Sequence, residues 1–254
     1  MKRIKSGWQL TKKSWGILSD EPGLIKFPIV GGVIALLIAI VLIAPGLYFL
    51  EADPVALGVV LVAVGTYLSA FVVCYFAVAL AHNADRRMQG EQVEFKDGMA
   101  LASSRMSAIA GWAFIATVVM TVIRAIQERF GIAGAILGGL AGAAWGVLSF
   151  LAVPDIAIEG TGPISTLKRC GNLVKSGWGA QITGTIAIGG IVFLLGFLPA
   201  VLFIIAGGFI FSTTAAGGGI LIAFGIVVLV VATLIQQALS TIFGVALYRW
   251  VSTK

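Results

Sequence analysis

The chain has 254 residues, of which 59% are hydrophobic and 11% are charged. Soluble domains are about 45–50% apolar and about 25% charged, and the mean hydropathy of +1.05 points away from them as well. This composition excludes a water-soluble globular domain, a disordered chain and a nucleic-acid-binding domain. It predicts an all-α, polytopic membrane protein in which the net charge of +6 bears on orientation in the bilayer and indicates no nucleic-acid partner.

Six apolar segments are long enough to cross a bilayer, which takes about 20 residues. They cover residues 27–50, 55–81, 107–126, 131–153, 180–211 and 220–248. Residues 1–26 form an amphipathic segment ahead of this transmembrane domain, which we place at 27–254. The last two spans share one uncharged run, which we divide at the small and polar residues 212–219. Pro199 predicts a kink in the fifth span, because proline lacks a backbone donor and clashes with the preceding turn.

The basic residues predict the orientation. Of the 17 Lys and Arg residues, all but Arg124 and Arg129 fall on one side of the membrane in this topology. These are Lys2, Arg3, Lys5, Lys12, Lys13, Lys26, Arg86, Arg87, Lys96, Arg105, Lys168, Arg169, Lys175, Arg249 and Lys254. Because cytoplasmic segments carry the excess of Lys and Arg, we expect both termini in the cytoplasm and the protein in the cell membrane.

A helical stripe precedes each pair of spans. The three stripes are Ile4, Trp8, Thr11, Trp15 and Leu18; Phe95, Met99, Ala102, Met106 and Ile109; and Ile164, Leu167, Gly171, Val174 and Trp178. All three use spacings of three and four residues, typical of one helix face. One interpretation is a threefold repeat of an amphipathic helix and a transmembrane hairpin; the other is chance similarity.

Tryptophans and cations in these segments predict contact with an anionic inner leaflet. The candidate membrane-surface residues are Trp8, Lys12, Lys13, Trp15, Lys168, Arg169, Lys175 and Trp178. The alternative is that the amphipathic helices pack on the cytoplasmic ends of the transmembrane helices, and the two arrangements are compatible.

The fourth span carries glycines four residues apart, which place a smooth strip along one helix face. They are Gly134, Gly138, Gly142 and Gly146, and Ala135, Gly139 and Ala143 widen the strip. Small residues allow close helix approach in lipid. We favour packing within the chain over a homodimer interface.

Arg124 and Glu128, four residues apart at the end of the third span, form a candidate polar site on the outer side. The favoured alternative is an interfacial pair that ends the span. The single histidine, His82, is expected to be an interfacial residue as well.

Catalytic and metal-binding patterns are missing from the sequence. It has no HExxH, no GxSxG, no phosphate-binding glycine loop and no CxxC, and no Asp lies within a predicted span. We therefore expect no enzyme, no cofactor and no metal site. The scarcity of charge in the spans also argues against ion-coupled transport.

Several sequence segments, spread over nearly the whole chain, resemble those of a known protein family. They are GWQLTKKSWGIL with KFP, FKDGMALASSRMSAIAGW, VPDIAIEGTGPISTLKRC with KSGWG, and ALYRW. In these the chain resembles an uncharacterised family of prokaryotic multi-pass membrane proteins, a domain of unknown function. The resemblance implies six spans facing the cytoplasm and no established activity, catalytic residue or cofactor.

Two functions stay open at this stage. The favoured one is a non-enzymatic membrane protein that organises or assists other membrane components, as a scaffold or complex subunit with a membrane-protein partner or a second copy. The alternative is a transporter or channel for a small neutral or lipid-like substrate, with a path lined by Gln181, Thr185, Gln236 and Gln237.

Overall fold

The computed structural model describes the backbone of residues 2–211 and 214–252 and the side chains of residues 7–173, 183–211 and 214–252. This part of the chain is all helical and contains no strand. Six of its helices are long and apolar enough to cross a membrane. They are Pro22–Glu51, Val55–Met88, Met106–Arg129, Gly131–Glu159, Thr183–Phe211 and Ala215–Ser252. The predicted fold class is therefore confirmed, and the protein is a multi-pass membrane protein.

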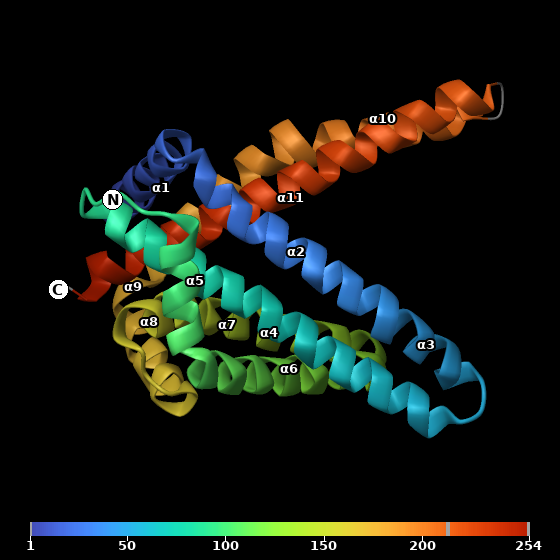
Figure 1. Ribbon diagram of the computed structural model, residues 1–254, viewed down its shortest axis with the longest axis horizontal. Helices are drawn as coiled ribbons and strands as arrows, with labels where there is room; N and C mark the ends of the chain where they lie inside the picture. The colour runs from blue at the N-terminus through green and yellow to red at the C-terminus, as the bar shows by residue number, and fades with distance from the viewer. Residues whose placement is uncertain (1, 212–213, 253–254) are drawn as a thin grey trace. The chain divides into compact units, whose positions relative to one another are not determined.

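The helices fall into two compact units, which are described separately (Figure 1). Unit 1 comprises residues 1–25 and 178–243, and unit 2 comprises residues 26–177 and 244–254. Unit 1 contains α1 (Lys2–Asp20), η1 (Pro22–Ile25), η3 (Phe193–Phe197) and α10 (Leu198–Phe211). Unit 2 contains α2 (Lys26–Ile38), η2 (Ala39–Ile43), α3 (Ala44–Glu51), α4 (Val55–Met88), α5 (Phe95–Ser104), α6 (Met106–Arg129), α7 (Gly131–Ser149) and α8 (Ala152–Glu159). Two helices, α9 (Pro163–Val192) and α11 (Ala215–Ser252), contribute to both.

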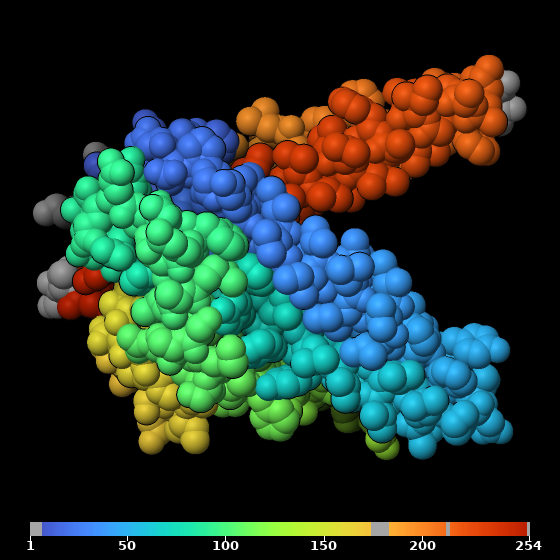
Figure 2. Space-filling view, in the orientation of Figure 1, coloured from blue at the N-terminus to red at the C-terminus, as the bar shows by residue number. Residues whose placement is uncertain are grey.

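The first hairpin of unit 2 is held together by glycines at the helix interface. Its first arm, α2 to α3, packs along α4, and the two run side by side in blue and cyan in Figure 2. A Cβ on Gly58 would lie 2.7 Å from the backbone nitrogen of Leu50, and one on Gly65 would lie 2.7 Å from Ile43. The absence of these side chains lets the two backbones approach, as expected for helices that associate in lipid.

Two spans contain a π-helical turn before a proline. The turn η2 ends two residues before Pro45, and η3 ends two residues before Pro199. Proline removes one donor and crowds the carbonyl four residues earlier, and a widened turn accommodates both effects. The irregularity predicted at Pro199 is therefore present, and the first and third hairpins share it at the same offset.

The fourth span is interrupted where the sequence predicts continuity. Helix α7 ends at Ser149, and α8 begins at Ala152. Pro154 lies in the first turn of α8, where its missing N–H costs nothing, but its ring would clash with the carbonyl of Phe150 in a continuous helix. The proline thus separates α8 from α7.

The division of the last two spans at residues 212–219 is partly wrong. Helix α11 already begins at Ala215, so the glycines that follow are helical. A Cβ on Gly218 would lie 2.5 Å from Phe211, and one on Gly207 would lie 2.8 Å from the Gly218 carbonyl. These glycines serve close helix contact next to the turn and do not break the helix.

In α1 and α9, most residues buried within the chain lie outside the predicted stripes, of which Ile4, Val174 and Trp178 are not among the residues with described side chains. In α1 the buried residues are Gly7, Thr11, Ser14 and Ile17, whereas Trp8 and Trp15 are 45% and 48% exposed. In α9 the predicted stripe residue Ile164 is exposed. Thr166 and Cys170 are buried in its place. Small and hydrogen-bonding residues replace large apolar ones on these faces. The stripe through α5 and α6 fits better, since Ala102 and Ile109 are fully buried.

The tightest packing of unit 2 lies at the end where α4 finishes, α5 and α6 begin and α8 finishes. We call this the charged end, because it holds Asp85, Asp155, Glu159, Arg169 and Arg249. Fully buried side chains gather next to it: Val78, Leu80, Ile109, Leu151, Ile156, Leu247 and Tyr248. The core of unit 2 therefore positions a set of charged groups.

Candidate functional site

Asp155 is the centre of a buried polar cluster at the charged end. Its side chain is fully buried. It accepts hydrogen bonds from the Tyr248 hydroxyl at 2.8 Å and from the Thr161 hydroxyl. The Tyr248 hydroxyl donates to Oδ1 and the Thr161 hydroxyl to Oδ2, and Nε of Arg169 lies 3.3 Å from Oδ1. A carboxylate so far from water is stable only when such donors surround it, and here they come from three different helices or helix ends.

Glu159 and Arg169 complete this cluster at its more exposed edge. Nη2 of Arg169 lies 3.0 Å from Oε1 of Glu159, which also accepts a hydrogen bond of 3.2 Å from Tyr248. The next residue, Cys170, is fully buried. Burial, aided by the negative charge of Asp155, raises the pKa of the Cys170 thiol to about 12. The thiol therefore stays protonated and acts as a small apolar side chain.

Gly160 ends α8 and allows the chain to turn sharply next to the Asp155 cluster. Its φ of 69° is left-handed, and its N–H donates to the carbonyl of Ile156 at 3.2 Å. The Arg105 guanidinium covers it so closely that a Cβ would lie 0.8 Å from Nη1. Only glycine fits both the backbone angle and the space.

A second ionic contact ties α4 to the end of α11. Arg249 donates from Nε to Oδ1 of Asp85 at 2.7 Å and from Nη2 to Oδ2 at 2.6 Å. Gln89 donates to Oδ2 of the same carboxylate at 3.0 Å. Bidentate guanidinium–carboxylate pairs fix geometry as well as charge. Neighbouring Asn83 donates to the Glu94 carbonyl at 2.8 Å, which anchors the loop before α5.

The contacts of Asp155 and Glu159 with Arg169 and Tyr248, and of Asp85 with Arg249, join four helices of unit 2, and we call these contacts together the clasp. Each carboxylate is satisfied by donors from other helices, and no group of three or more His, Cys, Asp or Glu side chains able to hold a metal occurs in the described part of the chain. The sequence reasoning missed Asp85, Asp155, Tyr248 and Arg249. Three of them lie in segments that carry the family resemblance, since Asp155 is part of VPDIAIEG and Tyr248 and Arg249 are part of ALYRW, whereas Asp85 lies in none of these segments.

The predicted membrane-surface residues are spread over both units. In α1, Nζ of Lys12 lies 5.7 Å from the ring of Trp8, and Lys13 and Trp15 are exposed. On α9, Lys168 is exposed, whereas Arg169 is half exposed and forms the ion pairs described above. Lys175 and Trp178 lie outside the residues whose side chains are described, as does Gln181.

The glycine face of α7 is covered along only part of its length. Gly134 and Gly138 are buried against α6, where Cβ atoms would lie 2.4 Å from the Ile126 carbonyl and 2.2 Å from Gln127. Gly142 makes only an ordinary contact with α6. Within the described structure, nothing lies within 4 Å of a Cβ built on Gly139 or Gly146.

Arg124 and Glu128 are both exposed on the last two turns of α6, and no ion pair joins them among the described residues. Because α6 starts beside the charged end and its 24 residues extend about 36 Å, the two lie at the opposite end of unit 2. His82 is half buried near the end of α4, within the span.

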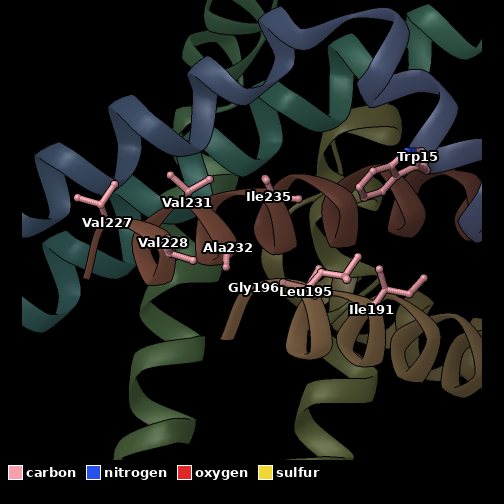
Figure 3. A pocket seen from close by; sticks show the side chains of 10 residues that line it. Trp15, Ile191, Leu195, Gly196, Val227, Val228, Val231, Ala232 and Ile235 are labelled. Carbon is pink, nitrogen blue, oxygen red and sulfur yellow. The ribbon is translucent and has the colours of Figure 1, made fainter. Parts of the chain in front are cut away.

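Unit 1 contains an apolar cavity of about 240 Å³ between the arms of its hairpin. Ile191, Leu195 and Gly196 line one arm, and Val227, Val231 and Ile235 line the other (Figure 3). Trp15 of α1 lies at one end of this row (Figure 3). Thr185, Gln236 and Gln237, expected to line a transport path, are not among the residues around it.

Unit 2 contains a larger apolar hollow of about 880 Å³, which we call the α4–α6 groove. Its lining comes from the end of α3, the first half of α4 and the middle of α6: Leu50, Val59, Val62, Ala63, Val64, Thr66, Tyr67, Phe114, Thr117, Val118, Thr121 and Val122. The hydroxyls of Tyr67, Thr117 and Thr121 donate to the carbonyls of Ala110, Ala113 and Thr117. An apolar occupant of the groove would therefore leave few of the lining polar groups without a hydrogen bond.

Comparison with known proteins identifies a family for this chain but no activity. Neither the curated proteins nor the solved structures contain a match to this chain. A family of unknown function, DUF6159, matches residues 59–254. The matched part includes Asp85, Asp155, Arg169, Tyr248 and Arg249, and it starts after the N-terminal phrase GWQLTKKSWGIL. The chain belongs to this family of unknown function, DUF6159.

Proposed function

We propose that this protein is a non-enzymatic membrane component that organises or assists other proteins of the cell membrane, with its charged end in the cytoplasm. The observation that carries the proposal is the uncovered part of the small-residue face of α7. In the described structure a Cβ on Gly139 or Gly146 would meet no atom within 4 Å, and Ala135 and Ala143 are exposed beside them. In lipid, where apolar burial gives no drive for association, such smooth strips are where helices meet.

The division of this face supports the same proposal. Gly134 and Gly138 already serve packing within the chain, against α6. The remaining strip is free to accept a helix of another protein or of a second copy. The clasp at the charged end supports a scaffold because it fixes α4, α8, α9 and α11 relative to one another in unit 2 by ionic contacts. A rigid frame of this kind suits a protein that positions others.

The test is bulky substitution on the free strip. Gly146→Leu should lower the amount of partner, or of second copy, that co-purifies in mild detergent by about tenfold or more. Gly208→Leu on α10 is the matched control, since that glycine also has nothing within 4 Å but lies outside the strip. A wild-type protein that elutes as a monomer without any associated protein contradicts the proposal.

A second candidate function, transport of a small neutral or lipid-like substrate, is supported by the apolar linings of the two cavities. Vesicles containing the purified protein would then move a fluorescent phospholipid between leaflets faster than empty vesicles. Filling the α4–α6 groove with Ala63→Phe would abolish that movement. An unchanged rate in the filled variant counts against transport through the groove.

A further inference from the structure

We propose that the α4–α6 groove and the charged residues beyond its mouth form a binding site for a zwitterionic phospholipid with a primary amine in its headgroup. One acyl chain of the lipid lies in the groove. Its phosphate contacts Arg124, and its ammonium group contacts Glu128. This site goes beyond the organising role proposed above and does not depend on it.

The groove fits a lipid chain in place, size and chemistry. It lies between membrane spans, and its volume of about 880 Å³ is within the range of sites that hold extended small molecules. Its lining is almost wholly apolar, and the hydroxyls of Tyr67, Thr117 and Thr121 already donate to backbone carbonyls. These three hydroxyls have no free hydrogen to donate to a polar occupant, whereas a hydrocarbon chain needs no donor.

The mouth is the end of the groove lined by Leu50, Thr121 and Val122, and the charged residues near it select the lipid headgroup. Thr121 lines the groove, and Arg124 follows it on α6 after about 4.5 Å of helix rise. Glu128 lies one further turn along, and both side chains are exposed with no ion pair between them. The cation of Arg124 and the anion of Glu128, about one turn apart and not paired with each other in the described part of the chain, match the phosphate and ammonium of a zwitterionic headgroup.

Two further features narrow the choice of lipid. Glu51 and Asp53, exposed close to the groove-lining Leu50, add two negative charges against the one further cation, Arg129, and disfavour anionic headgroups. A choline group has no N–H to donate to the Glu128 carboxylate, whereas an ethanolamine group has three. The site therefore favours ethanolamine over both choline and glycerol phospholipids.

Native mass spectrometry of the full-length protein tests this site. The protein is purified in detergent and offered an equimolar mixture of ethanolamine, choline and glycerol phospholipids with identical acyl chains. We expect the ethanolamine lipid to be retained about tenfold over the other two, as the loss of one charge-assisted hydrogen bond implies. Equal retention of all three, or a preference for the glycerol lipid, overturns the proposal.

Variants assign the contacts. Arg124→Gln should lower ethanolamine-lipid retention about tenfold, whereas Arg129→Gln, the same change about 7.5 Å further along α6, should not. Glu128→Gln should remove the discrimination against the glycerol lipid. Because these positions are exposed, the variants keep the fold. Retention unchanged in Arg124→Gln contradicts the site.

Filling the groove tests the chain-binding half. Ala63→Phe places a ring among the groove-lining residues and should displace the lipid whatever its headgroup. Ala141→Phe on α7 makes the same change at an exposed position outside the groove and should leave the lipid bound. Equal lipid retention by the two variants contradicts the assignment of the groove. Since neither change touches Gly139 or Gly146, loss of lipid with intact partner association separates this site from the organising role.

Discussion

Arg249 binds Asp85 through two hydrogen bonds of 2.7 and 2.6 Å, although 164 residues separate them in the chain. The pair joins the last helix to the end of the second span and lies beside the cluster around Asp155. In both places a carboxylate at the end of a transmembrane helix is met by donors from the C-terminal turns of α11. The charged end is therefore where distant parts of unit 2 are fastened together.

Breaking the Asp85–Arg249 pair should destabilise the protein modestly. Arg249→Met removes both donors and leaves the nearly buried Asp85 carboxylate with Gln89 as its described partner. Because the Arg249 side chain is 48% exposed and water can screen the charge, we expect about 1–2 kcal/mol, well below the cost for a fully buried pair. Thermal unfolding in detergent measures this. The exchange of the two residues, Asp85→Arg with Arg249→Asp, should recover part of the loss; no recovery would mean that the contact acts through packing alone.

Loss of the Tyr248 hydroxyl should cost more than its size suggests. Tyr248→Phe removes a donor to Asp155 and Glu159 and leaves Oδ1 of the buried Asp155 with the Arg169 guanidinium as its described partner. An unmet buried acceptor costs about 1–3 kcal/mol. Tyr48→Phe is the matched control, since that ring is 70% exposed. The melting temperature of the Tyr248 variant should fall by several degrees and that of the control should not; equal melting temperatures would rule out this role of the hydroxyl.

Gly160→Ala should be strongly destabilising. A side chain at a left-handed backbone position costs about 1–2 kcal/mol, and the new Cβ would also overlap the Arg105 guanidinium. Gly162→Ala, two residues further on, meets open space and should be nearly neutral. Yield of folded protein and melting temperature measure both. The double variant Gly160→Ala with Arg105→Ala separates the effects, because it relieves the overlap and keeps the backbone strain. A fully restored melting temperature in the double variant would show that the strain is negligible.

Neither cysteine should react with maleimide in the folded protein. Cys74 and Cys170 are both buried, and the Cys170 pKa of about 12 leaves almost no thiolate at pH 8. Both should label once the chain is unfolded in a strong ionic detergent. Ser104→Cys provides an exposed thiol as a positive control for the reagent. Rapid labelling of the wild-type folded protein at pH 8, read by intact mass, would contradict the burial of one of the two cysteines, and a peptide digest would identify which.

The local features of the fold follow from the sequence, and several of its junctions do not. Segment length and hydropathy predict all six spans, and proline chemistry predicts the irregular turn before Pro199. The break between α7 and α8 was missed, because the apolar run continues through residues 150–153 and Pro154, just beyond its end, was not interpreted as the first turn of a new helix. The glycines after residue 214 were interpreted as a turn, because glycine that permits a sharp bend and glycine that permits close helix contact look the same in a sequence.

The candidate sites divide in the same way. The strip on α7 and the residues Arg124 and Glu128 were identified from spacing along one helix. The Asp155 cluster was not, because its members come from α8, α9 and α11 and its partners lie up to 93 residues away. The faces of α1 and α9 that pack within the chain were not predicted either, because they carry hydroxyl and small side chains in place of the large apolar ones that a periodicity argument counts.

By itself the sequence determines that this chain is helical and has six segments long and apolar enough to cross a membrane, and it predicts that all but two of the cations lie on one side. Those properties depend on hydropathy and charge along the chain, which are local quantities. Only the tertiary structure decides that Asp85 meets Arg249, that Asp155 meets Tyr248, and that α3, α4 and α6 enclose an apolar groove below Arg124. These depend on which helices pack together, and the free energy of a buried charge or a cavity is set by neighbours that are distant in the sequence.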